Sequence, residues 1–356
     1  MTIPSDCSIL GKEVPVSDIE IELKKLWEAD DASTHASLMN FAVYSEDASA
    51  LACNSSMVRE ITREHACRAI LVGIDLDDPE VGMRSWITAH CNLANGKKAV
   101  CCEQIAFHLA GKVVGRYRNS IFAHLQSDLP LVFWWQGELT DRFDDRLYTL
   151  IARLIIDSAE WAEPRAQYRL LERALLQDGL VVQDLSWTRT YRVRLAIASL
   201  FDDHAGQAAL PKIEKVNIVV HPDNLQSGLQ LLAWMSTQCE WAFANDMLTS
   251  DRAPHSFSFQ SKGGKFIEAQ IVTDENSLAI NEVTLSGDDF EAKVSLGEND
   301  NLIHLVFDIQ GIHVEESTPA ESIEPQDLVR DQLSRGGKNS LFKKVFPRYI
   351  ELMDRS

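Results

Sequence analysis

Long hydrophobic runs are missing from this sequence of 356 residues. None approaches the roughly 18 apolar residues that a membrane-spanning helix requires, so we expect no membrane segment. Basic residues are also scarce, because 34 lysines and arginines face 53 aspartates and glutamates, which leaves a formal net charge of −19. An acidic excess of this size argues against a nucleic-acid backbone or an anionic membrane surface as the main partner.

Cysteines with the paired spacing of a metal site are missing as well. The seven cysteines are an odd number scattered along the chain, which fits a reducing cytoplasm better than a disulfide scaffold. Met1–Leu10 has neither a basic start nor a long apolar segment, so we expect no secretory signal. These patterns predict an acidic, cytoplasmic protein without a bound metal.

The motifs of the common enzyme classes are absent too. No glycine-rich loop ends in the Gly-Lys-Ser/Thr of a phosphate-binding loop, and the sequence contains no HExxH, GxSxG or CxxC. The stretch from Gly111 to Gly115 lacks the close glycine spacing that lets a backbone approach a dinucleotide pyrophosphate. We therefore expect neither catalytic residues nor a cofactor.

Among the features that are present, the segment Ser127–Gly137, SDLPLVFWWQG, is the most informative. A short apolar run between a polar turn and a glycine predicts a strand that is buried on both faces. Successive strand residues point to opposite faces, so Trp134 and Trp135 are expected on different sides of the sheet. The two rings are either core side chains beneath covering helices or anchors of a partner-binding surface.

Strand-like and helix-like segments alternate in the first part of the chain. Asn95-Gly96 between two strand-like runs predicts a hairpin, because both residues accept a positive φ. The alternation predicts an α/β N-terminal domain, residues 1–205, with a mixed, mostly parallel sheet covered by helices. We expect helices near 18–27, 50–65, 114–125, 144, 165–177 and 186–201, and strands near 68–75, 83–92, 98–108, 127–137 and 152–157.

Residues 206–356 form the second expected domain, after a small and polar stretch at Asp202–Lys212. A strand and a helix come first, and short strands separated by turn residues then predict an antiparallel meander in an α+β domain. Phe266–Val329 contains fifteen acids and one base, and Arg330–Ser356 contains seven bases and three acids. The acidic sheet is either kept soluble by its charge, with the basic helical tail docked on it, or binds a basic partner.

A cluster of His90, Cys91, Cys101, Cys102 and His108 is the best candidate for redox chemistry. With a two-residue turn in the hairpin, His90 lies opposite Cys101, whereas Cys91 and Cys102 are diagonal neighbours on one face. Their separation is at the limit of disulfide reach. The cysteines are either small buried side chains or a redox-sensitive pair, and we assign no metal to them.

The segment DLSWTR, Asp184–Arg189, predicts the beginning of a helix. The side chain of Asp184 or Ser186 can accept a hydrogen bond from the first amides of that helix. Three arginines lie in its first turns, where the helix dipole disfavours positive charge: Arg189, Arg192 and Arg194. Their guanidinium groups pair either with carboxylates of the chain, such as those of Asp157 and Glu160, or with a partner's carboxylates or a phosphate.

Several segments resemble the glucose-6-phosphate dehydrogenase assembly protein family, OpcA. They are HACRAILV (65–72), SWITAHC (85–91), CCEQIAFHLAG (101–111), SDLPLVFWWQGEL (127–139), LIIDSAEW (154–161), DLSWTR (184–189) and LFD (200–202). In order and spacing they cover most of residues 65–202. The resemblance implies a non-catalytic protein that promotes the assembly and activity of glucose-6-phosphate dehydrogenase. In cyanobacterial members it also implies redox sensitivity linked to thioredoxin.

On this resemblance we expect an allosteric activator that binds the dehydrogenase of the oxidative pentose phosphate pathway and favours its active oligomer. The expected partner-binding residues are Trp134, Trp135, Trp187, Arg189 and Arg192, and the expected redox residues are Cys91, Cys101 and Cys102. The alternative is a sugar-phosphate-binding enzyme or metabolite sensor. In that case the phosphate is held by Arg116, Arg118, Arg189 and Arg192.

Overall fold

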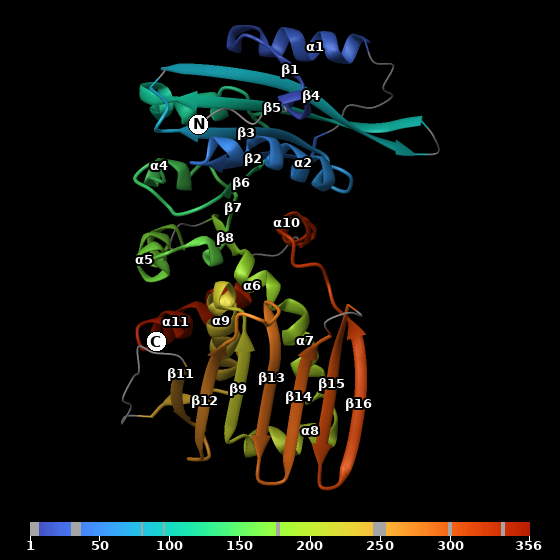
Figure 1. Ribbon diagram of the computed structural model, residues 1–356, viewed down its shortest axis with the longest axis vertical. Helices are drawn as coiled ribbons and strands as arrows, with labels where there is room; N and C mark the ends of the chain where they lie inside the picture. Colours follow the sequence, from blue (N-terminus) through green and yellow to red (C-terminus); the bar gives the residue numbers. More distant parts are fainter. Residues whose placement is uncertain are drawn as a thin grey trace. The chain divides into compact units, whose positions relative to one another are not determined.

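The computed structural model describes residues 7–29, 37–79, 81–94, 97–175, 179–244, 254–297, 301–335 and 339–356 (Figure 1). By their contacts the residues divide into unit 1 (1–162, 169–183 and 324–338) and unit 2 (163–168, 184–323 and 339–356). Each unit contains an eight-stranded mixed sheet with helices, so the prediction of two domains that each combine a sheet with helices is confirmed. Residues 184–205, which precede the predicted boundary, group with unit 2.

Unit 1 contains the strands that the sequence pattern predicted, together with three that it missed. Its strands are β1 (Lys12–Glu13), β2 (Met39–Ser45), β3 (Cys67–Asp75), β4 (Gly82–Ala94), β5 (Lys97–Ala110), β6 (Leu131–Trp135), β7 (Arg153–Ile156) and β8 (Val181–Asp184). Its helices are α1 (Ile19–Ala29), α2 (Leu51–Ile61), α3 (Tyr117–Phe122), α4 (Asp145–Tyr148), α5 (Pro164–Leu175, shared with unit 2) and α10 (Pro325–Ser334). The missed strands are β1, β2 and β8.

The strand order of unit 1 is β1-β4-β5-β3-β2-β6-β7-β8. From β5 to β7 the neighbouring strands are parallel, and β3 and β6 are almost entirely buried because helices cover both faces of such a sheet. Starting at β2, successive parallel strands are added first on one side and then on the other, which is the doubly wound order. The winding direction reverses between β2 and β6.

Strands β4 and β5 pair as the hairpin prediction required, with Ala94 opposite Lys97, whereas Asn95 and Gly96 lie outside the described residues. Pairing shifts by one residue further along, since Leu93 lies opposite Lys98 but Asn92 lies opposite Val100. Ala99 is therefore an extra residue on β5, as in a β-bulge. The bulge changes the register of every pair beyond it.

Unit 2 is built on a second sheet, in the order β10-β11-β12-β9-β13-β14-β15-β16. Its strands are β9 (Lys215–Val220), β10 (Ala242–Phe243), β11 (His255–Gln260), β12 (Phe266–Thr273), β13 (Ile280–Gly287), β14 (Phe290–Leu296), β15 (Leu302–Ile309) and β16 (Ile312–Pro319). Its helices are α6 (Leu185–Arg189), α7 (Tyr191–Ser199), α8 (His204–Ala209), α9 (Leu225–Gln238) and α11 (Ser340–Met353). All adjacent pairs are antiparallel except β9 and β12, and β13 to β16 form a meander.

Helices cover one face of this second sheet. In Figure 1, α7, α8 and α9 lie behind the strands, and α9 contacts β9 and β12 while α7 contacts β14 and β15. Alternate residues are accordingly buried, such as Ile267, Ala269 and Ile271 on β12. Among the described residues, no helix is both long and apolar enough to cross a membrane.

Candidate functional site

The crevice at the carboxyl ends of β2 and β6 is where doubly wound folds usually bind a ligand, because the loops on either side of the reversal diverge there. In this chain the loop after β2 is Glu46-Asp47-Ala48-Ser49-Ala50 and contains no glycine. Dinucleotide-binding proteins use glycines at this turn so that backbone amides reach the pyrophosphate. The two carboxylates placed there instead disfavour a bound phosphate by charge.

Glu46 is held in this crevice by several side chains. Its carboxylate accepts hydrogen bonds from Tyr44 Oη at 2.9 Å, Thr140 Oγ1 at 2.6 Å and Arg142 Nη1 at 3.0 Å. Burial raises the pKa of Tyr44, so its hydroxyl stays a hydrogen-bond donor. Asp47 accepts a hydrogen bond from Ser49 N at 2.8 Å and so caps the turn that precedes α2.

The opposite side of the crevice is closed by an amide pair. Gln136 follows β6, and its side chain exchanges two hydrogen bonds of 2.8 Å with the side chain of Asn54 on α2. Gly73 on β3 permits close packing of this helical segment, because a Cβ there would lie only 2.6 Å from Leu51 Cγ. The side chains of Glu46, Asn54 and Gln136 at this crevice are thus hydrogen-bonded to other groups of the chain.

Trp134 and Trp135 are core residues in this structure. They are 1% and 0% exposed, and the ring of Trp135 packs 4.1 Å from that of Tyr44. Trp135 Nε1 donates to Glu138 O at 2.9 Å, which satisfies its polar atom inside the core. A partner that docks on this structure as it stands does not reach either ring, so of the two sequence-based interpretations the burial favours the core.

Asp184 joins β8 to α6 and is fully buried. As predicted, it caps the helix, since its Oδ1 accepts a hydrogen bond from Ser186 N at 3.0 Å. Its Oδ2 accepts hydrogen bonds from Tyr168 Oη and, at 2.6 Å, from Gln230 Nε2. A carboxylate removed from water is stable only with such donors around it. The first turn of α6 is therefore fixed to α5 and α9.

Trp187 is likewise buried, at 4% exposure. The guanidinium of Arg194 lies 3.4 Å from the centre of its ring, and Arg194 Nη1 donates to Trp187 O at 3.0 Å. The ring centre of Phe342 in α11 lies 5.5 Å from that of Trp187. The tryptophan, the arginine and the C-terminal helix thus form one packed cluster within unit 2.

The remaining arginines have contacts of their own. Arg192 forms an ion pair with Glu321, and its side chain remains 41% exposed. Arg189 Nη1 lies 3.4 Å from Ser186 Oγ, and Arg118 pairs with Asp144 at 2.6 Å. Contact of Arg189 and Arg192 with a partner stays a prediction, and the exposed part of Arg192 is open to one.

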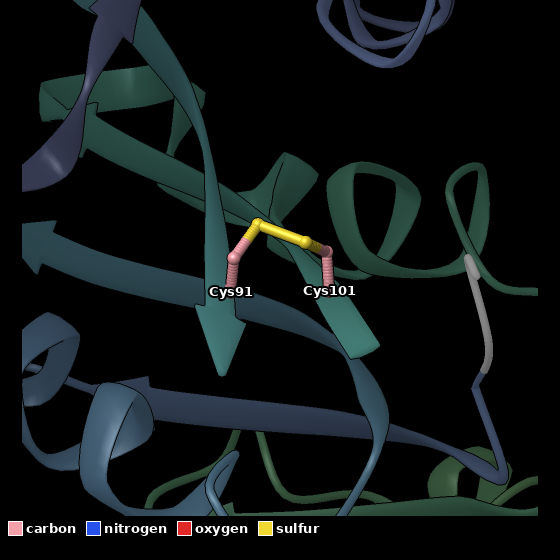
Figure 2. The surroundings of a disulfide bond; sticks show 2 residues. All are labelled: Cys91 and Cys101. Carbon is pink, nitrogen blue, oxygen red and sulfur yellow. A yellow bond between two sulfur atoms is a disulfide. The ribbon is translucent and has the colours of Figure 1, made fainter. Parts of the chain in front are cut away.

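The cysteine pair differs from the sequence-based expectation. The disulfide joins Cys91 on β4 to Cys101 on β5, directly opposite each other, and Figure 2 shows the two sulfurs bridging the strands. The expected neighbours, Cys91 and Cys102, are not paired, and Cys102 lies opposite His90. The reason is the bulge at Ala99, which moves the register by one residue and turns each β5 side chain to the other face.

Two thiols lie next to the disulfide in the same sheet. Cys67 and Cys102 are buried, and burial raises the pKa of each thiol, so both are held as unreactive thiols. His90 Nε2 donates a hydrogen bond to Gln104 Oε1 at 2.9 Å, and burial lowers the pKa of His90. Within the described ranges, no group of three or more histidine, cysteine and acidic side chains is placed to hold a metal ion.

Two adjoining cavities lie in unit 2, with volumes of about 540 and 360 Å³. Both are lined by Leu210, Ile213, Cys239 and Trp241. The smaller one is apolar, and the larger one also has Lys262 and Lys265 at its edge. None of the four arginines expected to hold a sugar phosphate lines either cavity.

Comparison with known families identifies the chain. A model of the glucose-6-phosphate dehydrogenase subunit N-terminal domain matches residues 58–173, and a model of the C-terminal domain of the same subunit matches residues 180–346. Together the two matches cover well over half of the chain. The chain belongs to the glucose-6-phosphate dehydrogenase assembly protein family, OpcA. The resemblance found in the sequence is confirmed.

A curated OpcA relative adds to this assignment. The putative OxPP cycle protein OpcA of Nostoc punctiforme is 26% identical over 186 residues, which is 51% of this chain and 40% of that protein. The match therefore spans less than half of the relative's length. The function of the complete relative is therefore only a proposal for this chain.

Two solved structures of one protein are similar to the OpcA chain in fold. KijD10, a 3-ketoreductase from Actinomadura kijaniata bound to TDP-benzene and NADP, matches in its open conformation with a TM-score of 0.51 and 10% identity, over 89% of this chain and 96% of that chain. A second structure of that complex matches with a TM-score of 0.50 and 8% identity, over 88% and 96% of the chains. At such identity the likeness concerns the fold alone.

Sequence reasoning on this OpcA chain missed the crevice. It noted the missing glycine motif but did not recognise β2, so it could not place Glu46 and Asp47 at the reversal of strand order. The signal was present in the short apolar run Phe41–Tyr44, which is followed by Ser45, two acids and a small-residue helix start. The link from Glu46 to Arg142 joins residues far apart in sequence and has no local signal.

Proposed function

We propose that this OpcA-family chain is a cytoplasmic, non-catalytic assembly factor that binds glucose-6-phosphate dehydrogenase and favours its active oligomer. The observation that carries the proposal is the match of both halves of the chain to the two domains of the dehydrogenase subunit family. A protein that binds only the active oligomer stabilises it in proportion to its differential affinity. Allosteric activation of the dehydrogenase then follows from mass action.

The crevice supports a role without chemistry of the chain's own. Glu46 and Asp47 place negative charge where related folds present amides to a phosphate, and Gln136 and Asn54 occupy each other's hydrogen-bonding groups. A nicotinamide dinucleotide entering this crevice has to displace those bonds and approach two carboxylates. We therefore expect the chain to act through contacts with another folded protein and not through a bound dinucleotide.

The test is to mix the purified chain with the dehydrogenase and measure the mass of the complex by light scattering. Activity is then measured with and without the chain over a range of dehydrogenase concentrations. We expect a complex, and a rise in specific activity that is largest where the dehydrogenase alone is dilute and dissociated. No complex together with unchanged kinetics refutes the proposal.

The disulfide favours redox control of this assembly as a second proposal. Cys91 is only partly buried, so a thiolate of a protein dithiol such as thioredoxin can approach its sulfur, whereas Cys101 is buried. Exchange breaks the S–S bond and leaves Cys91 and Cys101 as thiols, while the dithiol is oxidised to a disulfide. Reduction frees the β4–β5 hairpin from its cross-link.

Activation of the dehydrogenase is compared between the oxidised chain, the reduced chain and the double variant Cys91→Ser/Cys101→Ser. Redox control requires that the reduced chain and the double variant activate to the same extent, and that the oxidised chain differs from both. A Cys53→Ser variant is the control, because Cys53 is an exposed free thiol away from the hairpin. Equal activation by all forms contradicts redox control and leaves the assembly role intact.

A further inference from the structure

The second sheet has an uncovered face opposite α7, α8 and α9 (Figure 1). We define the uncovered face as the outward positions of β9 and β12 to β16, the rows that contain Lys215 and Asn217. Side chains on it are exposed or half-buried, as on β12, where Phe266, Glu268 and Gln270 alternate with buried residues. An antiparallel sheet with one solvated face is common, so exposure alone assigns no role.

The charge of the uncovered face is unbalanced. Five carboxylates lie on it, those of Glu268, Glu282, Glu291, Asp308 and Glu315. The two lysines on it are Lys215 and Lys293, so three negative charges are in excess. The cross-strand pairs place these groups side by side over the whole width of the sheet.

Some of these carboxylates already have partners, and two do not. Glu282 pairs with Lys293 at 2.6 Å, and His313 lies between Asp308 and Glu315. Glu268 and Glu291 are exposed and form no ion pair with any residue in the described part of the chain. Their charge is available to a binding partner without first breaking an internal bond.

An apolar anchor lies on the same face. Phe266 is 66% exposed at the beginning of β12, although a ring of this size is usually at least half buried. Half-buried Val219 and Val306 lie between the charged rows. An aromatic anchor among small polar side chains, with charges around it, is the composition of protein interfaces whose affinity depends on a few residues.

The extent of the face fits a specific interface. It spans six adjoining strands of six to eight residues each. With strands about 4.8 Å apart and about 3.4 Å per residue, this gives roughly 30 by 24 Å, or about 700 Å². A standard interface buries about 800 Å² on each partner. The face is therefore large enough for a stable complex, provided that its partner is complementary.

We propose that the uncovered face docks a folded protein whose contacting surface carries an excess of lysine and arginine. A second copy of the chain is the less suitable occupant, because face-to-face packing opposes two surfaces of the same negative sign. The proposal rests on the proposed function in one respect, namely that the partner is a glucose-6-phosphate dehydrogenase subunit. Phe266 then fills an apolar recess of that subunit, and Glu268 and Glu291 meet its basic side chains.

The test uses the full chain with Glu268→Lys and Glu291→Lys combined. Both side chains are exposed, so the variant is expected to keep the melting temperature of the parent. The matched control combines Glu28→Lys and Asp141→Lys, whose side chains are 65% and 94% exposed in unit 1, and changes the net charge equally. A third variant, Phe266→Ala, tests the anchor without a change of charge.

Binding of each variant to the purified dehydrogenase is measured at low and at physiological salt. We expect the double variant on the face to weaken binding by about tenfold or more at low salt, with a smaller loss at higher salt. Phe266→Ala is expected to weaken it by about tenfold at both salt concentrations. The control variant is expected to stay within about twofold of the parent.

The outcomes separate the two proposals. If the parent binds the dehydrogenase and the face variants bind equally well, the docking face is wrong and the assembly role stands. If the parent does not bind at all, the proposed function fails, and the dehydrogenase is excluded as the occupant. If light scattering shows that the chain forms a dimer that the face variants disrupt, a second copy is the occupant and the basic partner is wrong.

Discussion

Replacing Asp184 by alanine tests whether the DLSWTR segment stabilises unit 2 through buried hydrogen bonds. The carboxylate caps α6 through Ser186 N, a contribution of about 1 kcal/mol to the free energy of unfolding. It also accepts hydrogen bonds from Tyr168 and Gln230, and each buried donor left without an acceptor costs about 1–3 kcal/mol. Gln230 Nε2 also donates to Tyr168 Oη at 3.0 Å, so this donor keeps one acceptor in the variant and its share of the free-energy loss is smaller. We expect a net loss of about 3–5 kcal/mol.

Asp203→Ala is the matched control. Asp203 caps α8 by accepting a hydrogen bond from Gly206 N at 2.7 Å, but its side chain is exposed and holds no buried donors in the described part of the chain. The expected loss is about 1 kcal/mol. Both variants are unfolded in urea and followed by far-UV circular dichroism. The urea midpoint of the transition that includes unit 2 is compared between them, with the same dependence of the free energy on urea concentration for both. Equal losses in the two variants refute the reasoning, because burial of the network then contributes nothing beyond a cap.

Trp135→Ala is expected to lower the free energy of unfolding by about 3–5 kcal/mol in urea titrations, whereas Phe266→Ala changes it by about 0.5 kcal/mol or less; a reversed order contradicts the burial of the Trp pair. In NMR titrations, the pKa of His313 lies above its usual value because of hydrogen bonds to two carboxylates, and burial puts that of His90 below. The ion pairs of His313 are therefore complete at acidic pH and are lost as the pH rises through its raised pKa; a midpoint below the usual value contradicts them. Nicotinamide cofactors and hexose phosphates are expected to leave the melting temperature unchanged, and a ligand-specific rise favours the metabolite-sensor alternative.

The sequence predicted those elements whose residues obey a strong local rule. The hydrophobic run 131–135 formed β6, and Asn95-Gly96 between strand-like runs correctly predicted that β4 and β5 pair. β2 was missed because its apolar run is short and follows the buried polar residue Asn40, whose side-chain amide donates to the backbone carbonyls of Gln126 and Leu129. Without β2 the doubly wound order and its crevice could not be derived.

The cysteine pair was predicted wrongly for a reason that lies in the backbone. The turn residues set the register near the hairpin tip, but no residue type demands an extra residue at Ala99. A shift of one residue moves all β5 side chains beyond it to the other face of the sheet. Cys101 therefore lies opposite Cys91, and not opposite His90 as the turn alone predicted. Registers inferred from a turn are therefore safe only over the few pairs next to it.

The segments that identified the family are mostly inside the molecule. Trp135 and Trp187 pack in cores, and Asp184 satisfies buried donors, so their specific sequences follow from the demands of folding. A partner, in contrast, contacts surface side chains, and these can change without altering the backbone structure. The outward positions of a sheet are of this kind, because its inward positions form the core. The residues that identify such a family are therefore not the residues that form its binding surface. This is why we place the docking surface on the outward rows of the second sheet and not on the segments that identify the family.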